Sequence, residues 1–241
     1  MKIPTRSIVL LIILIICINI FLYNKITSDE SIINSFHKLY HTKYKVHQYT
    51  YWFGIKTLQT PLDMWNLQEI IYETKPDIII ETGTYLGGTS LFLAMILQNV
   101  NENGKIITID ILDQAEKASQ NKIYQDRVIS LIGNSVSNEI IEQVKILVKD
   151  AKTMVILDSA HEKNHVLTEL KKYSQFVSPG CYIIIHDTNF NGNPVKKNFG
   201  PGPKEAVMEF LKSTDEFIID KKKEKFLLTY SPQGYLKRIK N

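Results

Sequence analysis

From Pro61 to the end of the chain, short apolar runs alternate with longer stretches that have helical spacing. The apolar runs have the length of strands, and they lie at residues 77–81, 105–110, 127–132, 153–158 and 181–187. They stay apolar throughout, which is typical of strands that helices cover on both faces. The alternation therefore predicts an α/β fold built on a parallel sheet.

The stretches between these runs have helical composition or spacing, at residues 62–74, 87–100, 114–124, 137–149, 162–177 and 203–212. Two late runs, 217–219 and 226–230, flank the lysines at 221–223 like the strands of a hairpin, and we interpret the lysines as a solvated turn. A closing hairpin is unusual for a nicotinamide-binding fold and ordinary for a class I methyltransferase sheet. We therefore expect a Rossmann-like class I methyltransferase fold, with a mostly parallel seven-stranded sheet and a C-terminal antiparallel hairpin.

An uncharged apolar run occupies residues 7–23, after Lys2 and Arg6. A membrane-spanning helix needs about 20 apolar residues, within a range of about 17–25. A cleaved signal peptide, the alternative, has a shorter apolar region that ends at small residues, whereas this run ends at Phe21-Leu22-Tyr23. We therefore expect an uncleaved, single-pass transmembrane helix that anchors the protein in a membrane.

These features divide the chain into a short basic N-terminus, an anchor, a linker or cap segment and a methyltransferase domain, at residues 1–6, 7–23, 24–60 and 61–241. The segment before residue 61 is polar and aromatic, and it is open to three interpretations: a linker, a cap over a pocket or a membrane-surface segment. Basic residues lie on both sides of the anchor, so the positive-inside rule does not decide the membrane side of the domain.

The charge pattern argues against nucleic acid as a partner. The formal net charge is +4, and the lysines are scattered instead of forming a basic stripe. The only cysteines, Cys17 and Cys181, do not make a disulfide framework. The sequence leaves the oligomeric state open.

A glycine-rich turn follows the first strand, with the sequence ETGTYLGG at residues 81–88. Glycine suits a sharp strand-to-helix turn because it adopts backbone angles that other residues avoid. It also lets a ligand approach the free amides at the start of the helix. The spacing is E-x-G-x-x-x-G and not the G-x-G-x-x-G of dinucleotide-binding folds, which disfavours a dinucleotide. The cofactor that we expect at this turn is S-adenosylmethionine.

Polar residues at the ends of the first three strands complete the predicted cofactor site. Glu81 is expected to accept a hydrogen bond from the cationic amine of S-adenosylmethionine, directly or through water, and Asp110 suits the two vicinal ribose hydroxyls. Asn134 and Ser135 follow the third strand and would contact the adenine edge. The predicted cofactor-binding residues are Glu81, Gly83, Thr84, Gly87, Gly88, Asp110, Asn134 and Ser135.

Carboxylates and imidazoles follow the fourth and fifth strands. Because ligands of open α/β sheets bind outside the carboxyl ends of the strands, Asp158, His186 and Asp187 should stand on the same rim as the cofactor. Two carboxylates with a nearby imidazole suit Mg²⁺ or Mn²⁺, which would lower the pKa of an acceptor hydroxyl. The alternative is a hydrogen-bonded rim without a metal.

His161 is a candidate general base, because an unperturbed imidazole titrates near neutral pH. The alternative is a histidine that caps a helix start. His161 also opens the sequence HEKNH at residues 161–165, which matches the zinc-protease pattern H-E-x-x-H. That pattern needs both histidines inside one helix, whereas His161 directly follows a strand and a short turn, so a zinc protease is disfavoured.

Several blocks of the sequence resemble the cephalosporin hydroxylase and rhamnosyl O-methyltransferase family. They lie at residues 77–94, 157–166 with Glu169-Leu170, 179–188, 200–210 (GPGPKEAVMEF) and 225–238, so the resemblance covers roughly residues 60–240. It implies a class I methyltransferase fold with S-adenosylmethionine as cofactor, and often Mg²⁺. The metal ligands of the family fall on Asp158, His186 and Asp187, and His186 stands where an acidic residue is expected.

The predicted function is S-adenosylmethionine-dependent O-methyl transfer to a hydroxyl of a sugar, a glycolipid or a small metabolite. A divalent metal would assist, and Asp158, His161 and Asp187 would be the catalytic residues. The anchor is consistent with a lipid-linked acceptor, and the loop at residues 189–203 is long enough to act as a lid. The supply of this cofactor favours a cytoplasmic catalytic domain in a bacterium, and a domain that faces the Golgi lumen is the alternative in a eukaryote.

Two alternatives belong to other classes of protein. The first is a nicotinamide-dependent oxidoreductase, against which the glycine spacing argues. The second is a catalytically inactive, membrane-anchored protein that only binds the cofactor, against which the pair of Asp158 and Asp187 argues.

Overall fold

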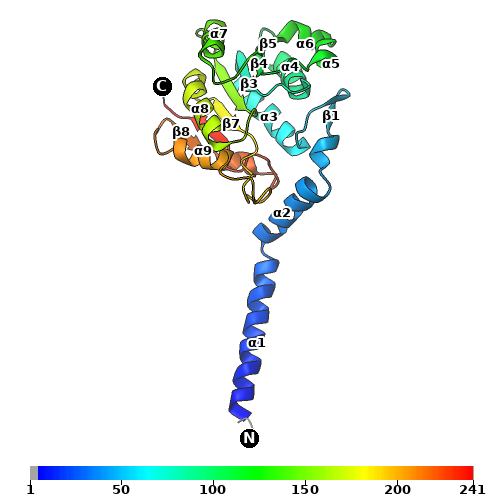
Figure 1. Cartoon of the computed structure of the whole chain (residues 1–241), viewed down its shortest axis with the longest axis vertical. Helices are drawn as coiled ribbons and strands as arrows, with labels where there is room; N and C mark the ends of the chain where they lie inside the picture. Colours follow the sequence, from blue (N-terminus) through cyan, green and yellow to red (C-terminus); the bar gives the residue numbers. More distant parts are fainter. Residues whose placement is uncertain (1–4, 241) are drawn as a thin grey trace.

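The computed structural model describes residues 5–240, and its globular part is built on a seven-stranded sheet (Figure 1). The strand order is β5-β4-β3-β6-β7-β9-β8. The strands are β3 (Ile78–Thr82), β4 (Lys105–Asp110), β5 (Val128–Ile132), β6 (Thr153–Leu157), β7 (Tyr182–Ile185), β8 (Phe217–Ile219) and β9 (Tyr235–Arg238). Strands β3 to β7 pair in parallel, whereas β9 pairs antiparallel with β7 and β8. The predicted Rossmann-like fold with a mostly parallel seven-stranded sheet is confirmed.

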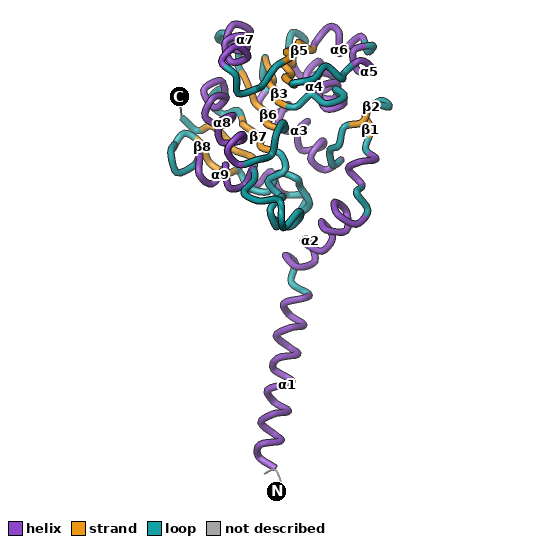
Figure 2. The backbone as a smooth tube through the Cα atoms, viewed as in Figure 1, coloured by secondary structure: helices purple, strands orange, loops and turns teal. Residues whose placement is uncertain are grey.

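Helices precede, connect and follow the parallel strands, as Figure 2 shows by colour. They are α3 (Pro61–Thr74), α4 (Gly88–Val100), α5 (Glu116–Ser119), α6 (Lys122–Arg127), α7 (Asn138–Val148), α8 (Lys163–Tyr173) and α9 (Pro203–Phe210). Short 3₁₀ turns lie at η3 (Ser174–Phe176) and η4 (Lys221–Glu224). Helix α4 packs on α3 and on α6, and α8 packs on α9.

The apolar runs form the core because the sheet buries both of their faces. Every residue of β3, β6 and β7 is buried, and Ile79, Ile80, Val155 and Ile156 belong to one hydrophobic cluster. Burying an aliphatic side chain of this size contributes about 1.5–3 kcal/mol. The middle of the sheet is therefore a rigid platform for the loops at its carboxyl edge.

The C-terminal hairpin differs from the prediction. Residues 226–230 are not a strand, and the partner of β8 is β9, farther along the chain. A Cβ atom on Gly234 would lie 2.3 Å from the backbone oxygen of Ile185. The glycine therefore lets the tail come close enough for β9 to pair with β7. The side chain of Asp63 in α3 holds Thr229 and Tyr230 outside the sheet.

Two smaller predictions were also wrong in detail. Residues 114–124 were expected to form one helix, but the chain breaks between α5 and α6, where Asn121 caps α6 by accepting from the amide of Ile123. The lysines at 221–223 were expected to form a solvated turn. Instead, Lys223 is buried and its amine lies 2.6 Å from a Glu73 carboxylate oxygen.

The N-terminal part leads into the globular part through a series of short elements. They are α1 (Thr5–Ile26), α2 (Asp29–Lys38), the π-helix η1 (Leu39–Lys43), the 3₁₀ turn η2 (Val46–Tyr49) and the two-stranded β1 (Tyr51–Trp52) and β2 (Ile55–Lys56). Helix α1 projects away from the sheet (Figure 1), and its described apolar side chains are exposed.

The expected membrane span stays a prediction. No single described helix has the length and hydropathy of a span, although the helices Leu10–Ile26 and Asp29–Lys43, bent by 56° at their junction, reach them as a pair. Residues 1–4 of the predicted basic N-terminus lie outside the described residues.

Candidate active site

The strand order reverses between β3 and β6, because the chain continues from β3 to β4 on one side and from β6 to β7 on the other. Ligands of open α/β sheets bind at this point, outside the carboxyl ends of the strands. A cavity of about 660 Å³ lies there. Its wall includes residues that follow β3, β4, β5, β6 and β7.

The predicted glycine turn forms one wall of the cavity. Gly83 has φ +91°, and a Cβ atom there would lie 2.0 Å from the backbone oxygen of Asp158. Gly88, at the start of α4, would carry a Cβ atom 2.6 Å from the backbone oxygen of Lys56. Both glycines are thus required because neighbouring backbone approaches them.

Asp110 lies where it was predicted, at the end of β4 and in the cavity wall. Its Oδ2 accepts a hydrogen bond from the Tyr85 amide at 2.8 Å, and its Oδ1 accepts one from the Leu112 amide at 3.1 Å. These amides hold the carboxylate in one orientation. Each oxygen keeps a lone pair that can accept from a ribose hydroxyl.

Glu81 is not in the cavity wall, in contrast to the role that the sequence suggested for it. Its side chain is buried, and its Oε2 accepts hydrogen bonds from the hydroxyls of Ser90 and Thr108. Burial raises the pKa of Glu81 to about 7, with a smaller contribution from the charge of Asp110, while the two hydroxyl donors oppose the rise. The position of Glu81 therefore fits a brace that joins β3, β4 and α4 beneath the turn.

The other predicted cofactor residues divide in the same way. Gly83, Thr84, Gly88, Asn134 and Ser135 line the cavity, and Gly87 does not. Gly87 has φ +78°, and a Cβ atom there would lie 2.7 Å from the Cβ of Ala118. Its glycine is explained by backbone conformation and packing.

A polar cluster that the sequence did not suggest borders Ser135. The Ser135 hydroxyl lies 3.2 Å from Nε2 of His165, which lies 3.5 Å from a carboxylate oxygen of Glu169. Hydrogen bonding to Glu169 raises the pKa of His165. Ser159 donates to the same glutamate at 2.7 Å and also lines the cavity.

Asp158 and Asp187 meet across the ends of β6 and β7, as predicted. The strands pair in parallel with Leu157 opposite Ile185, so the next residues are Asp158 and His186, and Asp187 comes one residue later. Asp187 has φ +56°, a conformation that aspartate tolerates better than most residues and that clusters at functional sites. Nε2 of His161 lies 3.1 Å from Oδ2 of Asp187, so the structure brings the three predicted catalytic residues together.

The two carboxylates hold protons more readily than exposed aspartates do. Burial raises the pKa of Asp158 well above its ordinary value, and the charges of Asp187 and Glu81 add to the effect. Burial also raises the pKa of Asp187, while the charges of His161 and Lys196 lower it. A cation bound between the carboxylates would offset the repulsion, so this part of the cavity is suited to positive charge.

His186 lies beside Asp158, with its Nδ1 3.6 Å from Oδ2 of Asp158, but it is not part of the potential metal-binding group. One ligand atom from each of Asp158, His161 and Asp187 lies within 4.8 Å of the others, so the imidazole in this potential metal-binding group comes from His161. The buried His186 has its Nδ1 2.9 Å from Nε2 of Gln59, which also donates to Asp158 at 2.8 Å. An amide donor requires an unprotonated Nδ1, and burial lowers the pKa of His186 to about 4.

The H-E-x-x-H pattern does not form a zinc site. His161 precedes α8 and contacts Asp187, whereas His165 lies inside α8 and contacts Glu169. The two histidines therefore serve different parts of the cavity, as expected from a pattern that straddles a helix start.

Several residues of the cavity wall were missed by the sequence interpretation. They come from the segment before residue 61 and from late loops: His41, His47, Thr57, Gln59, Phe190, Lys196 and Tyr230. The richness of residues 40–53 in histidine and aromatic side chains was the available signal, and a cap over a pocket was one of its three interpretations. The structure supports that interpretation for residues 41–59.

Comparisons with known proteins agree with this geometry. A family model described as Rhamnosyl O-methyltransferase/CmcI matches residues 44–239. The rhamnosyl O-methyltransferase of Mycobacterium tuberculosis (strain H37Rv) is 35% identical over 218 residues, which cover 87% of this chain and 86% of the relative. The rhamnosyl O-methyltransferase of Mycobacterium leprae is 34% identical over 217 residues, covering 87% and 91%.

Solved structures share the fold. A structure of CmcI with Mg and S-adenosylmethionine has a TM-score of 0.63 at 17% identity, covering 80% of this chain and 78% of that chain. The O-methyltransferase TomG from Streptomyces achromogenes, in complex with S-adenosylmethionine, has a TM-score of 0.55 at 13% identity, covering 91% and 95%. The match to this family contradicts the alternative hypothesis of a nicotinamide-dependent oxidoreductase. The chain belongs to the rhamnosyl O-methyltransferase/CmcI family, and it is an S-adenosylmethionine-dependent O-methyltransferase.

Proposed function

We propose that this enzyme methylates a hydroxyl of a sugar, and that a divalent cation assists the transfer. The name shared by the relatives, rhamnosyl O-methyltransferase, supports a sugar acceptor. The observation that carries the proposal is the group of Asp158, His161 and Asp187, which shares one cavity with the glycine turn and Asp110.

The cofactor would occupy the half of the cavity that β3, β4 and β5 border. The Asp110 carboxylate would accept from the ribose hydroxyls, and the backbone at Gly83 and Thr84 would lie along the cofactor. Asn134 and Ser135 would face the adenine edge. Glu81 would act indirectly in this proposal, because it holds the turn through Ser90 and Thr108.

The acceptor would occupy the half bordered by β6 and β7. Its hydroxyl oxygen forms a bond to the sulfonium methyl carbon, the carbon–sulfur bond breaks, and the hydroxyl proton leaves. His161 is the proposed base, with Asp187 orienting its ring and balancing the imidazolium that forms. The products are a methyl ether, S-adenosylhomocysteine and a proton.

A divalent cation fits the donor set of two carboxylates and one imidazole. Asp158, Asp187 and His161 would hold it, and it would supply Lewis acidity that makes the acceptor hydroxyl more acidic. When the cation is bound, His161 would serve either as a ligand of the cation or as the base that accepts the proton of the acceptor hydroxyl. The side chain of Gln59 would keep Asp158 in place through its hydrogen bond.

The experiment measures transfer of a radiolabelled methyl group from S-adenosylmethionine to methyl α-L-rhamnoside, with and without EDTA. We expect transfer that falls on chelation and recovers with Mg²⁺ or Mn²⁺. Asp187→Asn should lose at least about a hundredfold of the rate while it still binds S-adenosylhomocysteine in a calorimetric titration. Asp113→Asn, which does not line the cavity, is the matched control.

The outcomes separate the parts of the proposal. Transfer that is insensitive to EDTA would remove the metal and keep the sugar acceptor. A protein that binds the cofactor product but methylates no glycoside would contradict the sugar acceptor. An unchanged rate in Asp187→Asn would remove the role of the carboxylate pair.

We also propose that α1 attaches the enzyme to a membrane, with the catalytic part on the cytoplasmic side where the cofactor is supplied. The exposed apolar side chains along α1 support attachment. A glycolipid acceptor would then lie within reach of the enzyme.

A further inference from the structure

The acceptor half of the cavity has an aromatic wall that lies outside the parallel sheet. His41 comes from η1 and His47 from η2, whereas Phe190 and Tyr230 come from loops that follow β7 and precede β9. All four line the cavity. We call these four residues the aromatic wall.

The rings of the aromatic wall are packed against one another. His41 stacks on His47 with ring centroids 4.7 Å apart and 16° between the planes. The rings of Tyr230 and Phe190 meet His41 edge-on, with centroids at 5.4 Å and 5.9 Å. The wall therefore presents aromatic surface in a defined shape.

The wall borders the catalytic group directly. The ring of His161 meets Phe190 edge-on at 5.3 Å, and His161 lies 3.1 Å from Asp187. The amine of Lys196 lies 3.5 Å from the centre of the Phe190 ring. A molecule whose hydroxyl faces Asp187 would thus touch the wall with the rest of its body.

The wall is neutral, although it contains two histidines. Burial lowers the pKa of His41 to about 3, and the nearby His47, Lys196 and His37 lower it further in the same direction. Burial also lowers the pKa of His47 and raises that of Tyr230. A neutral imidazole has one nitrogen that donates a hydrogen bond and one that accepts a hydrogen bond. A hydroxyl group can likewise donate and accept.

Polar atoms of this wall have no partners among residues 5–240. They are Nδ1 of His41, Nδ1 of His47 and the hydroxyl of Tyr230, all buried from water. Buried polar groups without partners are uncommon in folded proteins, and their presence together at a cavity calls for an explanation. These atoms have no accessible surface in the ligand-free structure, so a ligand in the cavity can pair with them only after their side chains rotate.

Three classes of acceptor can be compared on these grounds. A purely apolar acceptor would leave the polar atoms unpaired. An anionic acceptor would meet the carboxylates of Asp158 and Asp187, and the charge of Lys196 is already partly balanced by Asp187. A neutral ring that carries several hydroxyls can pack its C–H face on the aromatic surface and pair its hydroxyls with the polar atoms.

We propose that His41, Tyr230 and Phe190 bind the ring of a neutral, polyhydroxylated acceptor beside Asp187 and select it over charged or apolar acceptors. This inference rests on the proposed sugar methylation and adds the residues that recognise the sugar. His41 lies before the part of the chain that the family model matches. The segment that leads from α1 to the sheet is thus part of the acceptor site.

The test uses the full chain in detergent, with methyl α-L-rhamnoside as acceptor. Tyr230→Phe removes one hydroxyl and leaves no cavity, and we expect it to raise the KM for the glycoside about fivefold, the value of one hydrogen bond. His41→Ala should raise the KM further, and His41→Asn should recover part of the loss. All three variants should bind S-adenosylhomocysteine as the wild type does. Tyr44→Phe, an exposed position in the same segment, is the matched control.

A second readout is independent of turnover. Saturation-transfer NMR on the complex with S-adenosylhomocysteine should show the rhamnoside protons on the wild type and weaker transfer on Tyr230→Phe. If the wild type methylates the rhamnoside and Tyr230→Phe and His41→Ala keep its KM, this inference is overturned while the proposed function stands. Preference for a sugar phosphate over the neutral glycoside would overturn it as well. If the wild type binds S-adenosylhomocysteine but methylates no glycoside, the proposed function fails first.

Discussion

At the scale of single residues, Gly83 links the local backbone to the site. The sequence indicated a glycine for a sharp turn and a close ligand. The structure adds that the backbone of Asp158 approaches Gly83, so one position joins the cofactor half and the acceptor half of the cavity. A side chain at this position would separate the ends of β3 and β6.

Gly83→Ala should therefore destabilise the protein by about 3 kcal/mol, from the left-handed backbone and from overpacking together. The matched control is Gly180→Ala, because Gly180 has φ +81° and a Cβ atom there would meet nothing within 4 Å. The control should lose only about 1–2 kcal/mol. Urea unfolding of both variants measures the difference, and equal losses would show that contact with Asp158 has no effect.

Glu81 makes a prediction about pH. Its pKa is about 7 in the folded protein and 4.5 as the ordinary value. Between these values the folded state holds a proton that the unfolded state has lost, so the free energy of unfolding falls as the pH rises through this window. Below pH 4.5 both states are protonated, and the contribution of Glu81 is fully present.

Glu81→Gln should remove this dependence. The difference between the two pKa values is equivalent to about 3 kcal/mol, so the stability of the variant relative to the wild type should rise by up to that amount between pH 4.5 and about pH 8. Urea titrations of the ligand-free protein at several pH values measure it. The exposed Glu142→Gln is the control, and parallel pH profiles of wild type and Glu81→Gln would contradict the raised pKa.

At the scale of elements, α3 positions the aromatic wall through a buried carboxylate. Asp63 lies in the first turn of α3, and its Oδ1 accepts from the hydroxyls of Thr229 and Tyr235 at 2.5 Å and 2.9 Å. Its Oδ2 accepts from the Tyr230 amide at 2.8 Å. Thr229 and Tyr230 are thus held against α3, outside the sheet.

Asp63→Ala should cost about 3 kcal/mol, because it leaves several buried donors without an acceptor. Asp63→Asn, which keeps one oxygen, should cost less. Chemical denaturation gives the stabilities, and Tyr72→Phe on the exposed face of α3 is the control. A loss below about 1 kcal/mol in Asp63→Ala would show that the loop is held by other contacts.

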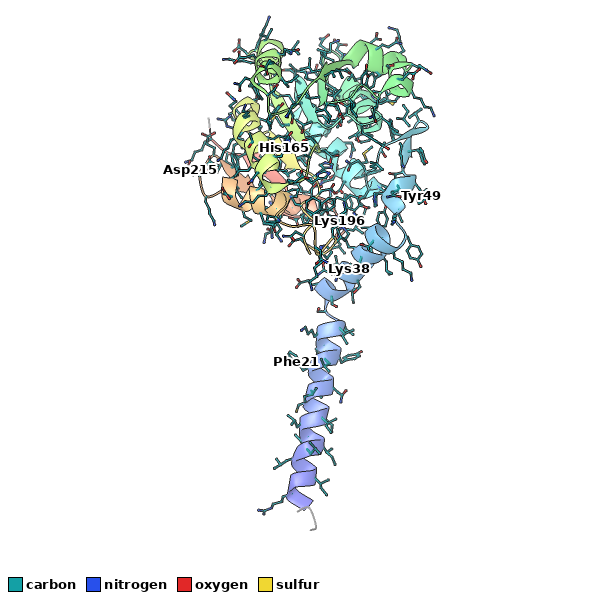
Figure 3. All side chains as sticks on the ribbon, in the orientation of Figure 1. Phe21, Lys38, Tyr49, His165, Lys196 and Asp215 are labelled. Carbon is teal, nitrogen blue, oxygen red and sulfur yellow. The ribbon has the colours of Figure 1, made fainter. Side chains whose placement is uncertain are left out.

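At the scale of the whole molecule, the chain consists of the projecting helix α1, the sheet domain and, between them, the segment that contributes His41 and His47 to the aromatic wall. Figure 3 places Lys38 and Lys196 on the side of the globular part from which the helix extends, with Phe21 on the helix itself. In the order of the chain, the first two residues of the aromatic wall lie between the projecting helix and the sheet. Attachment at α1 would therefore hold the acceptor side of the cavity near the membrane.

A chain that begins at Thr27 tests the separation of these parts. It removes α1 and keeps Ser28, whose side chain caps α2. We expect the same melting temperature and the same affinity for S-adenosylhomocysteine, because the apolar side chains of α1 are exposed. The full chain should partition into the detergent phase of Triton X-114 and the shortened chain into water. Loss of cofactor binding on shortening would show that α1 is part of the fold.

The sequence alone determined the elements whose patterns are local. Apolar runs of strand length predicted β3, β4, β5, β6 and β7, because burial on two faces leaves a pattern that needs no knowledge of partners. The residues after each strand followed from the same pattern, which is how Asp110, Asp158 and Asp187 could be assigned to one rim. The family resemblance added the cofactor to that rim.

Only the tertiary structure decided contacts between residues far apart in the chain. It placed Glu81 behind the turn instead of in the cavity, paired His186 with Gln59, and brought His161 to Asp187. It also showed that β9, and not residues 226–230, pairs with β8, and it placed His41 beside Tyr230. These outcomes depend on which atoms meet after folding, and a pattern along the chain carries no information about which of two nearby histidines or runs will make the contact.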